Sequence, residues 1–290
     1  MFSTIQEDFL INSSHSWNIC SGSVSAGKTF INNYRLYEHF YSLPDNSLFI
    51  IIGRTGESIY DNVIRDLLQY DMIEDFVYSK APQRILIKSK GIEIACVGAD
   101  NESSWTRVQG KTTAGAMFDE ITNLPENLVK TVAKGCRHMG KQWPKFATTN
   151  PDAPSHWVKE QLIDNKALDS QIWYFKLTDN PVLTEAYKRE IMSTYTGAMY
   201  SRMIEGLWVM AEGTIYANFD RRVHVKTKAD IPKFREYILG ADWGYAHPLA
   251  LNLYGIDYDG AYWCLDEIHL IHQLIDESLV KIIKDKGWLN

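Results

Sequence analysis

Eight residues near the amino terminus have the types and spacing of a loop that binds phosphate groups. They are Gly22, Ser23, Val24, Ser25, Ala26, Gly27, Lys28 and Thr29, and they match G-x-x-x-x-G-K-[ST] at each fixed position. In such a loop, backbone N–H groups bind phosphate oxygens, the lysine reaches the β- and γ-phosphates, and the last hydroxyl contacts Mg²⁺. A chance match in a chain of this length has a probability on the order of one per cent. The phosphate loop (residues 22–29) therefore predicts that the protein binds ATP with Mg²⁺.

Hydrolysis needs a carboxylate that holds the metal, and one follows an apolar run later in the chain. Asp119 and Glu120 come directly after Ala-Gly-Ala-Met-Phe. We expect Asp119 to hold Mg²⁺, directly or through water, and Glu120 to polarise the attacking water. An Asp-Glu pair after a strand is by itself more often a solvated turn, but the phosphate loop upstream favours catalysis. The two segments predict an ATPase with Lys28 and Glu120 as catalytic residues.

Polar side chains also end a further apolar run. Thr148, Thr149 and Asn150 follow Lys-Phe-Ala and precede Pro151. Beside the phosphate loop they could hydrogen-bond the γ-phosphate or the attacking water, so that loss of the phosphate moves a loop. The same residue types favour a helix N-cap or a turn, and both roles can hold at once.

Three arginines could stabilise the charge that builds on the γ-phosphate. Arg54 follows the second predicted strand, at the edge where α/β sheets bind ligands. Arg107 and Arg137 compete with it, and each of the three is more often a surface side chain. We take Arg54 as the candidate.

The apolar pattern predicts a scaffold that brings these strand ends together. It predicts strands over residues 17–21, 47–53, 84–87, 92–97, 114–118 and 145–149, and helices over residues 28–43, 57–70 and 127–137. This alternation predicts an α/β fold of the P-loop (RecA-like) class, with a mostly parallel sheet and helices on both faces. Residues 155–200 are largely helical in pattern, apart from a strand over residues 172–177.

A second strand-rich segment begins near residue 237. It has predicted strands over residues 237–242, 249–254 and 261–265 and a helix over residues 275–284. Residues 211–230 have the turn residues and charge of a linker. We predict a P-loop ATPase domain over residues 1–210, with a helical subdomain at 155–210. A linker over 211–230 and the start of a second α/β domain over 231–290 follow.

The composition is that of a soluble globular protein, with 290 residues, 45% apolar residues and a net charge of −6. The negative charge argues against a protein that coats nucleic acid, although it allows a local basic track. Such a track could follow a helix and the next loop, or be a solvated face, over Lys130, Lys134, Arg137, Lys141 and Lys145. No apolar run is long enough to span a bilayer, and the amino terminus does not resemble a signal peptide, so we expect no membrane association.

Beyond the phosphate loop, the chain resembles the large subunit of a tailed-phage or prophage terminase, from about Trp17 to the end. The most specific segments are 97–102 (Val-Gly-Ala-Asp-Asn-Glu), 109–112 (Gln-Gly-Lys-Thr), 147–151 (Ala-Thr-Thr-Asn-Pro), 154–157 (Pro-Ser-His-Trp), 179–181 (Asp-Asn-Pro), 205–208 (Glu-Gly-Leu-Trp) and 212–216 (Glu-Gly-Thr-Ile-Tyr). Many members have an arginine inside the phosphate loop, whereas residues 23–26 here are Ser-Val-Ser-Ala. An arginine acting in cis must then come from elsewhere, which keeps Arg54 in consideration.

The resemblance implies a motor that couples ATP hydrolysis to the movement of double-stranded DNA into a procapsid. The implied partners are viral DNA, the portal protein, the terminase small subunit and further copies of the chain in a ring on the portal, in the host cytoplasm. It also implies a C-terminal RNase H-like nuclease that uses two Mg²⁺ or Mn²⁺ ions, with Asp242 in residues 240–244 (Gly-Ala-Asp-Trp-Gly) as the first metal ligand.

One carboxylate cannot hold two metal ions, so the nuclease needs further ligands. Asp266 and Glu267 could reach the site or lie in a solvated turn, and we expect the second and third carboxylates of such a site to be absent from this chain. We therefore expect an engineered truncation or a natural fragment that hydrolyses ATP weakly and does not cut DNA. Two alternatives stay open. One is a helicase, although the chain has room for only one P-loop core, and the other is a non-enzymatic fragment that binds nucleotide and docks on a portal or small subunit.

Overall fold

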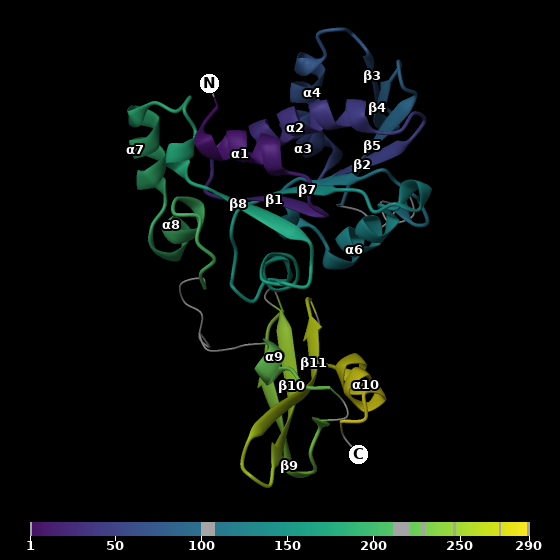
Figure 1. Cartoon of the computed structure of the whole chain (residues 1–290). Coiled ribbons are helices and arrows are strands. Elements are labelled where there is room, and N and C mark those ends of the chain that lie inside the picture. Colours follow the sequence, from purple (N-terminus) through teal and green to yellow (C-terminus); the bar gives the residue numbers. More distant parts are fainter. Residues whose placement is uncertain are drawn as a thin grey trace. The chain divides into compact units, whose positions relative to one another are not determined.

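Most strands belong to one eight-stranded sheet with the order β3-β4-β5-β2-β6-β7-β1-β8 (Figure 1). The computed structural model describes residues 2–99, 108–210, 221–227, 230–245, 248–272 and 274–288. The chain divides into two compact units, Met1–Asn218 and Phe219–Asn290. Within the described residues, no helix is long and apolar enough to cross a membrane.

The strands of the first unit are mostly parallel. They are β1 (Trp17–Gly22), β2 (Leu48–Gly53), β3 (Phe76–Lys80), β4 (Gln83–Ile87), β5 (Ile92–Gly98), β6 (Ala116–Phe118), β7 (Lys145–Thr149) and β8 (Ser170–Phe175). Among the described pairings of this sheet, β3–β4 and β4–β5 are antiparallel and the others are parallel. Because the carboxyl ends of parallel strands meet at one edge, the residues after β1, β2, β6 and β7 come together there. The predicted mostly parallel α/β fold is confirmed.

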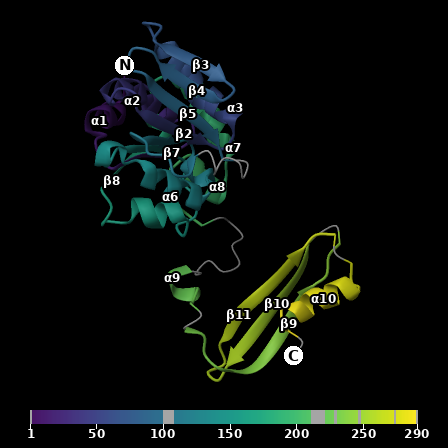
Figure 2. The same cartoon turned by 90° about the vertical axis from the view of Figure 1, so that its right-hand side faces the viewer.

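Helices cover both faces of this sheet (Figures 1 and 2). The helical segments are α1 (Thr4–Asn12), α2 (Lys28–Ser42), α3 (Gly56–Ile59), α4 (Arg65–Tyr70), α6 (Glu126–Gly135), α7 (Glu185–Thr194) and α8 (Gly197–Met203), with π-helical turns at Tyr60–Ile64 and Lys159–Ile163 and 3-10 turns at Ile121–Asn123, His138–Gly140 and Leu177–Asp179. Along β2, Phe49 and Ile51 pack with α1 to α4, whereas Ile50 and Ile52 pack with α6. Burial on both faces explains why this strand is apolar throughout.

In the first unit, three elements differ from what the apolar pattern predicts. The pattern misses α1, in which Gln6 and Phe9 are the buried residues, and it misses the edge strand β3. The strand expected at 172–177 is β8, which pairs with β1 and so belongs to the main sheet rather than interrupting a helical subdomain. Only Phe76 of β3 is buried, so the apolar pattern that predicts a strand is weak there.

The second unit has a three-stranded antiparallel sheet, β11-β10-β9, and one covering helix among its described residues. Its elements are α9 (Arg221–His224), β9 (Phe234–Asp242), β10 (Leu249–Asp257), β11 (Tyr262–Leu270) and α10 (Glu277–Asp285). Leu279 and Ile283 of α10 pack against Leu249, Leu251 and Ile268 of the sheet. Residues 211–220, which hold part of the predicted linker and the segment 212–216, lie outside the described residues, as do residues 100–107.

Candidate nucleotide site

The phosphate loop joins the end of β1 to the start of α2. A Cβ on Gly22 would lie 1.9 Å from the backbone oxygen of Phe175 in β8. Gly27 caps α2 with φ +82, a backbone conformation that side chains disfavour. The two fixed glycines are therefore required by a close backbone approach and by a left-handed turn.

Neighbouring segments hold the outer part of this loop. The amides of Ser23 and Val24 donate to the backbone oxygens of Phe175 (2.9 Å) and Met203 (2.8 Å). The side-chain amide of Asn180 donates to the backbone oxygen of Ser25 at 2.7 Å. Because the first two amides hold the loop in place, a phosphate would meet the amides of residues 25–29 at the α2 N-terminus.

Lys28 is buried and is held by three oxygen atoms. Its Nζ donates to the backbone oxygens of Gly22 (3.0 Å) and Ser23 (2.5 Å) and to Oδ1 of Asn150 (2.9 Å). Burial lowers the pKa of Lys28 to about 8, although the charges around it, including Glu120 and Asp119, oppose the shift. The lysine thus lies on the phosphate loop itself and bridges it to the end of β7.

Asp119 follows β6 and is almost fully buried. Each of its carboxylate oxygens accepts one hydrogen bond, Oδ1 from Thr148 (2.9 Å) and Oδ2 from Asn62 (2.8 Å). Burial raises the pKa of Asp119, and the hydrogen bonds from Asn62 and Thr148 oppose that rise. A cation beside this carboxylate would favour its ionised form.

Glu120 has an unusual backbone conformation for a residue with a side chain, with φ 49 and ψ 57. Its amide donates to the hydroxyl of Thr148 (3.0 Å), and its Oε2 accepts from Asn123 (3.0 Å). Left-handed backbone at a non-glycine residue is strained and clusters at functional sites. The turn after β6 therefore buries Asp119 and leaves Glu120 exposed.

Most of the predicted residues line two adjoining hollows, whereas Gly22, Ser23 and Asp119 line neither. The first, about 190 Å³, is lined by Val24, Ser25, Lys28, Thr29, Glu120, Thr148, Thr149 and Asn150. The second, about 270 Å³, is lined by Ser25, Ala26, Gly27, Lys28, Thr29, Phe30, Asn180, Leu183 and Tyr187. The hydroxyl of Thr148 donates to Asp119. The hydroxyl of Thr149 lies 3.1 Å from the hydroxyl of Thr122 and 2.9 Å from the backbone oxygen of Asn150. Both threonines are thus engaged within the protein.

The candidate arginines do not line these hollows. Arg54 follows β2 with an exposed side chain, and Arg107 lies outside the described residues. Arg137 lines a separate hollow of about 750 Å³ with the other members of the basic run, Lys130, Lys134, Lys141 and Lys145. Lys145 differs from its neighbours because it is buried, donates to the hydroxyl of Ser16 (2.9 Å) and lies 5.6 Å from the ring centre of Trp17. It therefore has a packing role rather than a place on an open track.

Asp242 lies at the end of β9 in the second unit. Asp242 pairs with Ala250 of β10, and paired residues share one face of the sheet. The next residue, Leu251, lies on the other face and packs against α10. Asp266 is on the α10 face, where Lys286 donates to it at 2.7 Å, so the structure does not support the alternative in which it reaches Asp242. Asp266 also lies within β11 rather than in a turn. Glu267 shares the face of Asp242. Among the described residues there is no group of three His, Cys, Asp or Glu side chains placed to hold a metal.

The residue-type patterns do not identify the asparagines that support the site. Asn62 contacts Asp119, Asn123 contacts Glu120, and Asn180 contacts the phosphate loop. The sequence does contain a signal for Asn62, which lies in the middle of the helix predicted over residues 57–70. Asparagine is unfavourable at such a position unless its amide has a partner.

Comparisons with known proteins identify one matching family and several similar structures. The family model for the N-terminal part of the terminase large subunit, T4likevirus-type, matches residues 19–223. The large terminase of a thermophilic bacteriophage is 28% identical, with a TM-score of 0.69 over 98% of this chain and 73% of that chain. The complex of that terminase with ATP-gamma-S is 26% identical, with a TM-score of 0.66 over 99% and 74%. The large terminase ATPase domain of Thermus phage P74-26, 12% identical, shares the fold with a TM-score of 0.55 over 71% and 93%.

No curated protein matches the chain. The family model nevertheless spans most of the first unit, including the whole phosphate loop, β6 and β7. The chain therefore belongs to the family of terminase large subunits, T4likevirus-type.

Proposed function

We propose that this chain is the ATP-hydrolysing motor subunit of a viral DNA-packaging terminase, which couples hydrolysis to the movement of double-stranded DNA into a procapsid. The observation that carries the proposal is the hollow lined jointly by the phosphate loop, Glu120 and the end of β7. Family membership supports the packaging role, and the similar large terminase of the thermophilic bacteriophage was solved with ATP-gamma-S.

In this proposal the triphosphate lies along the α2 N-terminus. Lys28 exchanges the carbonyl oxygens of Gly22 and Ser23 for phosphate oxygens, whose charge favours its protonated form. The adjoining hollow, with Phe30, Leu183 and Tyr187 on its walls, takes the ribose and base, because aromatic and aliphatic side chains suit a nucleobase.

The residues present fit a magnesium ion. The Thr29 hydroxyl and the Asp119 carboxylate are the hard oxygen ligands that Mg²⁺ prefers, and each oxygen of Asp119 keeps a lone pair beside the hydrogen bond that it accepts. Bound there, Mg²⁺ would offset charge on the β- and γ-phosphates. Glu120, whose side chain is oriented by Asn123, would accept a hydrogen bond from the attacking water. Arg54 stays a candidate for γ-phosphate contact only if its exposed side chain turns toward the hollow.

Asn150 would report the state of the nucleotide. It contacts Lys28 directly, and residues 151–157 follow it toward the π-helical turn Lys159–Ile163. If Lys28 moves to a phosphate, Asn150 loses its partner and the loop after β7 can shift. Thr148 and Thr149 would act in this step by fixing Asp119 and the strand end.

The basic hollow is our candidate for contact with DNA. Lys130, Lys134, Arg137 and Lys141 are exposed around it, and this local positive charge contrasts with the net charge of the chain. The proposed role implies three protein partners, which are the portal protein, the terminase small subunit and further copies of the chain. It also implies a location in the host cytoplasm. We further propose that residues 231–290 belong to an RNase H-like segment, in which Asp242 by itself does not hold a pair of Mg²⁺ or Mn²⁺ ions.

The test compares nucleotide binding with phosphate release in the wild type and in Glu120→Gln. We expect both proteins to bind ATP and only the wild type to turn it over, with a loss of at least about a hundredfold in kcat for the variant. If both bind ATP and neither hydrolyses it, the non-enzymatic alternative replaces the motor. Strand separation by the isolated wild type would instead favour a helicase.

A further inference from the structure

The helix after β2 has an irregular turn beside the catalytic carboxylates. Between α3 and α4, Tyr60–Ile64 forms a π-helical turn in which the amide of Arg65 donates to the oxygen of Tyr60. Such turns hold one extra residue and often occur at functional sites. Here Ile59, Val63 and Leu67 keep their places in the core, while the side chain of Asn62 reaches Asp119.

We propose that Asn62 is a positioning residue for magnesium, acting through Asp119. Its amide fixes Oδ2 of Asp119 at 2.8 Å while Thr148 fixes Oδ1 at 2.9 Å. Two donors on opposite oxygens hold the carboxylate plane in one orientation and leave lone pairs for a cation. This inference rests on the proposed ATPase function.

Asn62 is itself fixed to the helix that carries the other metal-binding candidate. Asn33 of α2 donates from its side-chain amide to the backbone oxygen of Asn62 (2.7 Å) and to Asp66 Oδ2 (3.0 Å). Asn33 lies four residues after Thr29, and residues at i and i+4 share one face of a helix. The path from Thr29 along α2 through Asn33 and Asn62 to Asp119 therefore sets the spacing of the two oxygen ligands.

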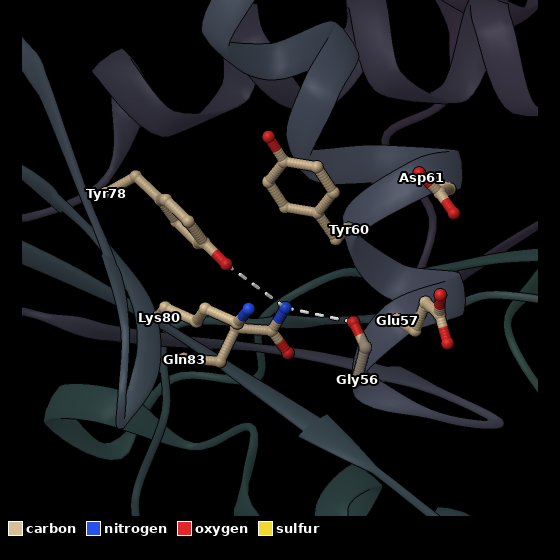
Figure 3. A pocket seen from close by; sticks show the side chains of 7 residues that line it. All are labelled: Gly56, Glu57, Tyr60, Asp61, Tyr78, Lys80 and Gln83. Carbon is tan, nitrogen blue, oxygen red and sulfur yellow. Dashed lines mark hydrogen bonds between the residues drawn. The ribbon is translucent and has the colours of Figure 1, made fainter.

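The opposite side of the same turn has a different environment. Tyr60 and Asp61 line a hollow of about 840 Å³ together with Tyr78, Lys80 and Gln83 (Figure 3). The rings of Tyr60 and Tyr78 are 5.5 Å apart, and Asp61 pairs with Arg65 at the surface. Asp61 is the residue before Asn62 in the π-helical turn, and it pairs with Arg65 rather than with Asp119. Asp61→Asn is therefore the matched control for the Asn62 variants.

The test measures how strongly Mg²⁺ enhances nucleotide binding. The dissociation constant of ADP is determined with Mg²⁺ and with EDTA for the wild type, Asn62→Ala, Asn62→Asp and Asp61→Asn. Removing a group that orients a metal ligand typically lowers metal affinity about ten- to a hundredfold. The Mg²⁺ enhancement is the ratio of the ADP dissociation constant in EDTA to that in Mg²⁺. We expect this ratio to be about tenfold smaller in Asn62→Ala than in the wild type, while the dissociation constant in EDTA is unchanged. Asn62→Asp should lose more, because it places a second carboxylate against Asp119. Asp61→Asn should match the wild type.

A merely structural role predicts another result. If Asn62 only stabilised the fold, Asn62→Ala would weaken binding equally in Mg²⁺ and in EDTA, and that outcome overturns the inference. Unchanged Mg²⁺ enhancement in either Asn62 variant also overturns it, and the isosteric Asn62→Asp provides this answer if the alanine variant does not fold. A wild type that binds no nucleotide refutes the proposed function instead, so the two failures are distinct.

Discussion

Lys28 donates a hydrogen bond to Oδ1 of Asn150 at 2.9 Å, and this bond joins the phosphate loop to the end of β7. Two residues earlier in the chain, Thr148 donates to Asp119. One strand end therefore contacts both the phosphate-binding lysine and the carboxylate proposed to hold the metal. A change in what Lys28 binds is transmitted directly to Asn150.

This contact predicts the effect of placing a carboxylate at position 150. In Asn150→Asp, the new carboxylate would pair with the Lys28 ammonium and raise its pKa. The nucleotide would have to compete with this pair, so we expect the affinity for ADP to fall about tenfold by calorimetric titration. Asn127→Asp makes the same charge change on the exposed surface of α6 and should bind ADP as the wild type does. Equal affinities in the two variants would refute the prediction.

The lowered pKa of Lys28 predicts a pH dependence of nucleotide binding. Burial holds this pKa at about 8, so the free protein has a charged lysine below that pH and a neutral one above it. Phosphate binds the charged form, and the dissociation constant of ADP should be flat near pH 7. It should rise above pH 8 toward about tenfold per pH unit. Titrations in EDTA from about pH 7 to 9.5 measure this. Lys28→Arg stays charged, and its profile should remain flat; a rise there would assign the effect to another group.

The close approach at Gly22 predicts a severe effect of one methyl group. Gly22→Ala would place its Cβ 1.9 Å from the Phe175 oxygen, so β8 or the phosphate loop must shift. We expect a loss of about 2 to 4 kcal/mol in the free energy of unfolding and at least tenfold weaker ADP binding. Gly110 also has a positive φ, +75, but there is open space around the Cβ that Gly110→Ala would add. It should cost only about 1 kcal/mol and leave ADP binding intact. Urea unfolding and ADP titration of both variants check this.

The basic hollow predicts a salt-dependent effect of DNA on the ATPase. We expect Lys134→Glu and Lys141→Glu, tested singly, to weaken the stimulation of the ATPase by double-stranded DNA. Each variant should also lower the slope of log binding constant against log salt concentration by about one unit. Basal ATP turnover should not change, because neither residue lines the nucleotide hollows. Lys166→Glu reverses an exposed charge that does not line the basic hollow and serves as the control. If DNA stimulation is insensitive to salt, the hollow is a solvated basic face.

The sequence by itself determined the class of fold and the segments that form the candidate site. The phosphate loop has its glycines at fixed positions because backbone contact and a left-handed turn exclude side chains, so their spacing is visible in the sequence. The apolar runs that end in Asp119 and Thr148 predict buried parallel strands, because burial on both faces requires apolar residues throughout. Local rules were sufficient for these features.

Only the tertiary structure decided which polar groups meet. Asn62 reaches Asp119 through one extra residue in a helical turn, and no local pattern predicts that turn. Asp266 and Glu267 are neighbours in sequence, yet strand alternation turns Asp266 toward α10 and Glu267 toward the face of Asp242. Lys145 belongs to a basic run but is buried against Trp17. These outcomes depend on strand register and on packing between segments distant in the chain, which residue types and spacing do not specify.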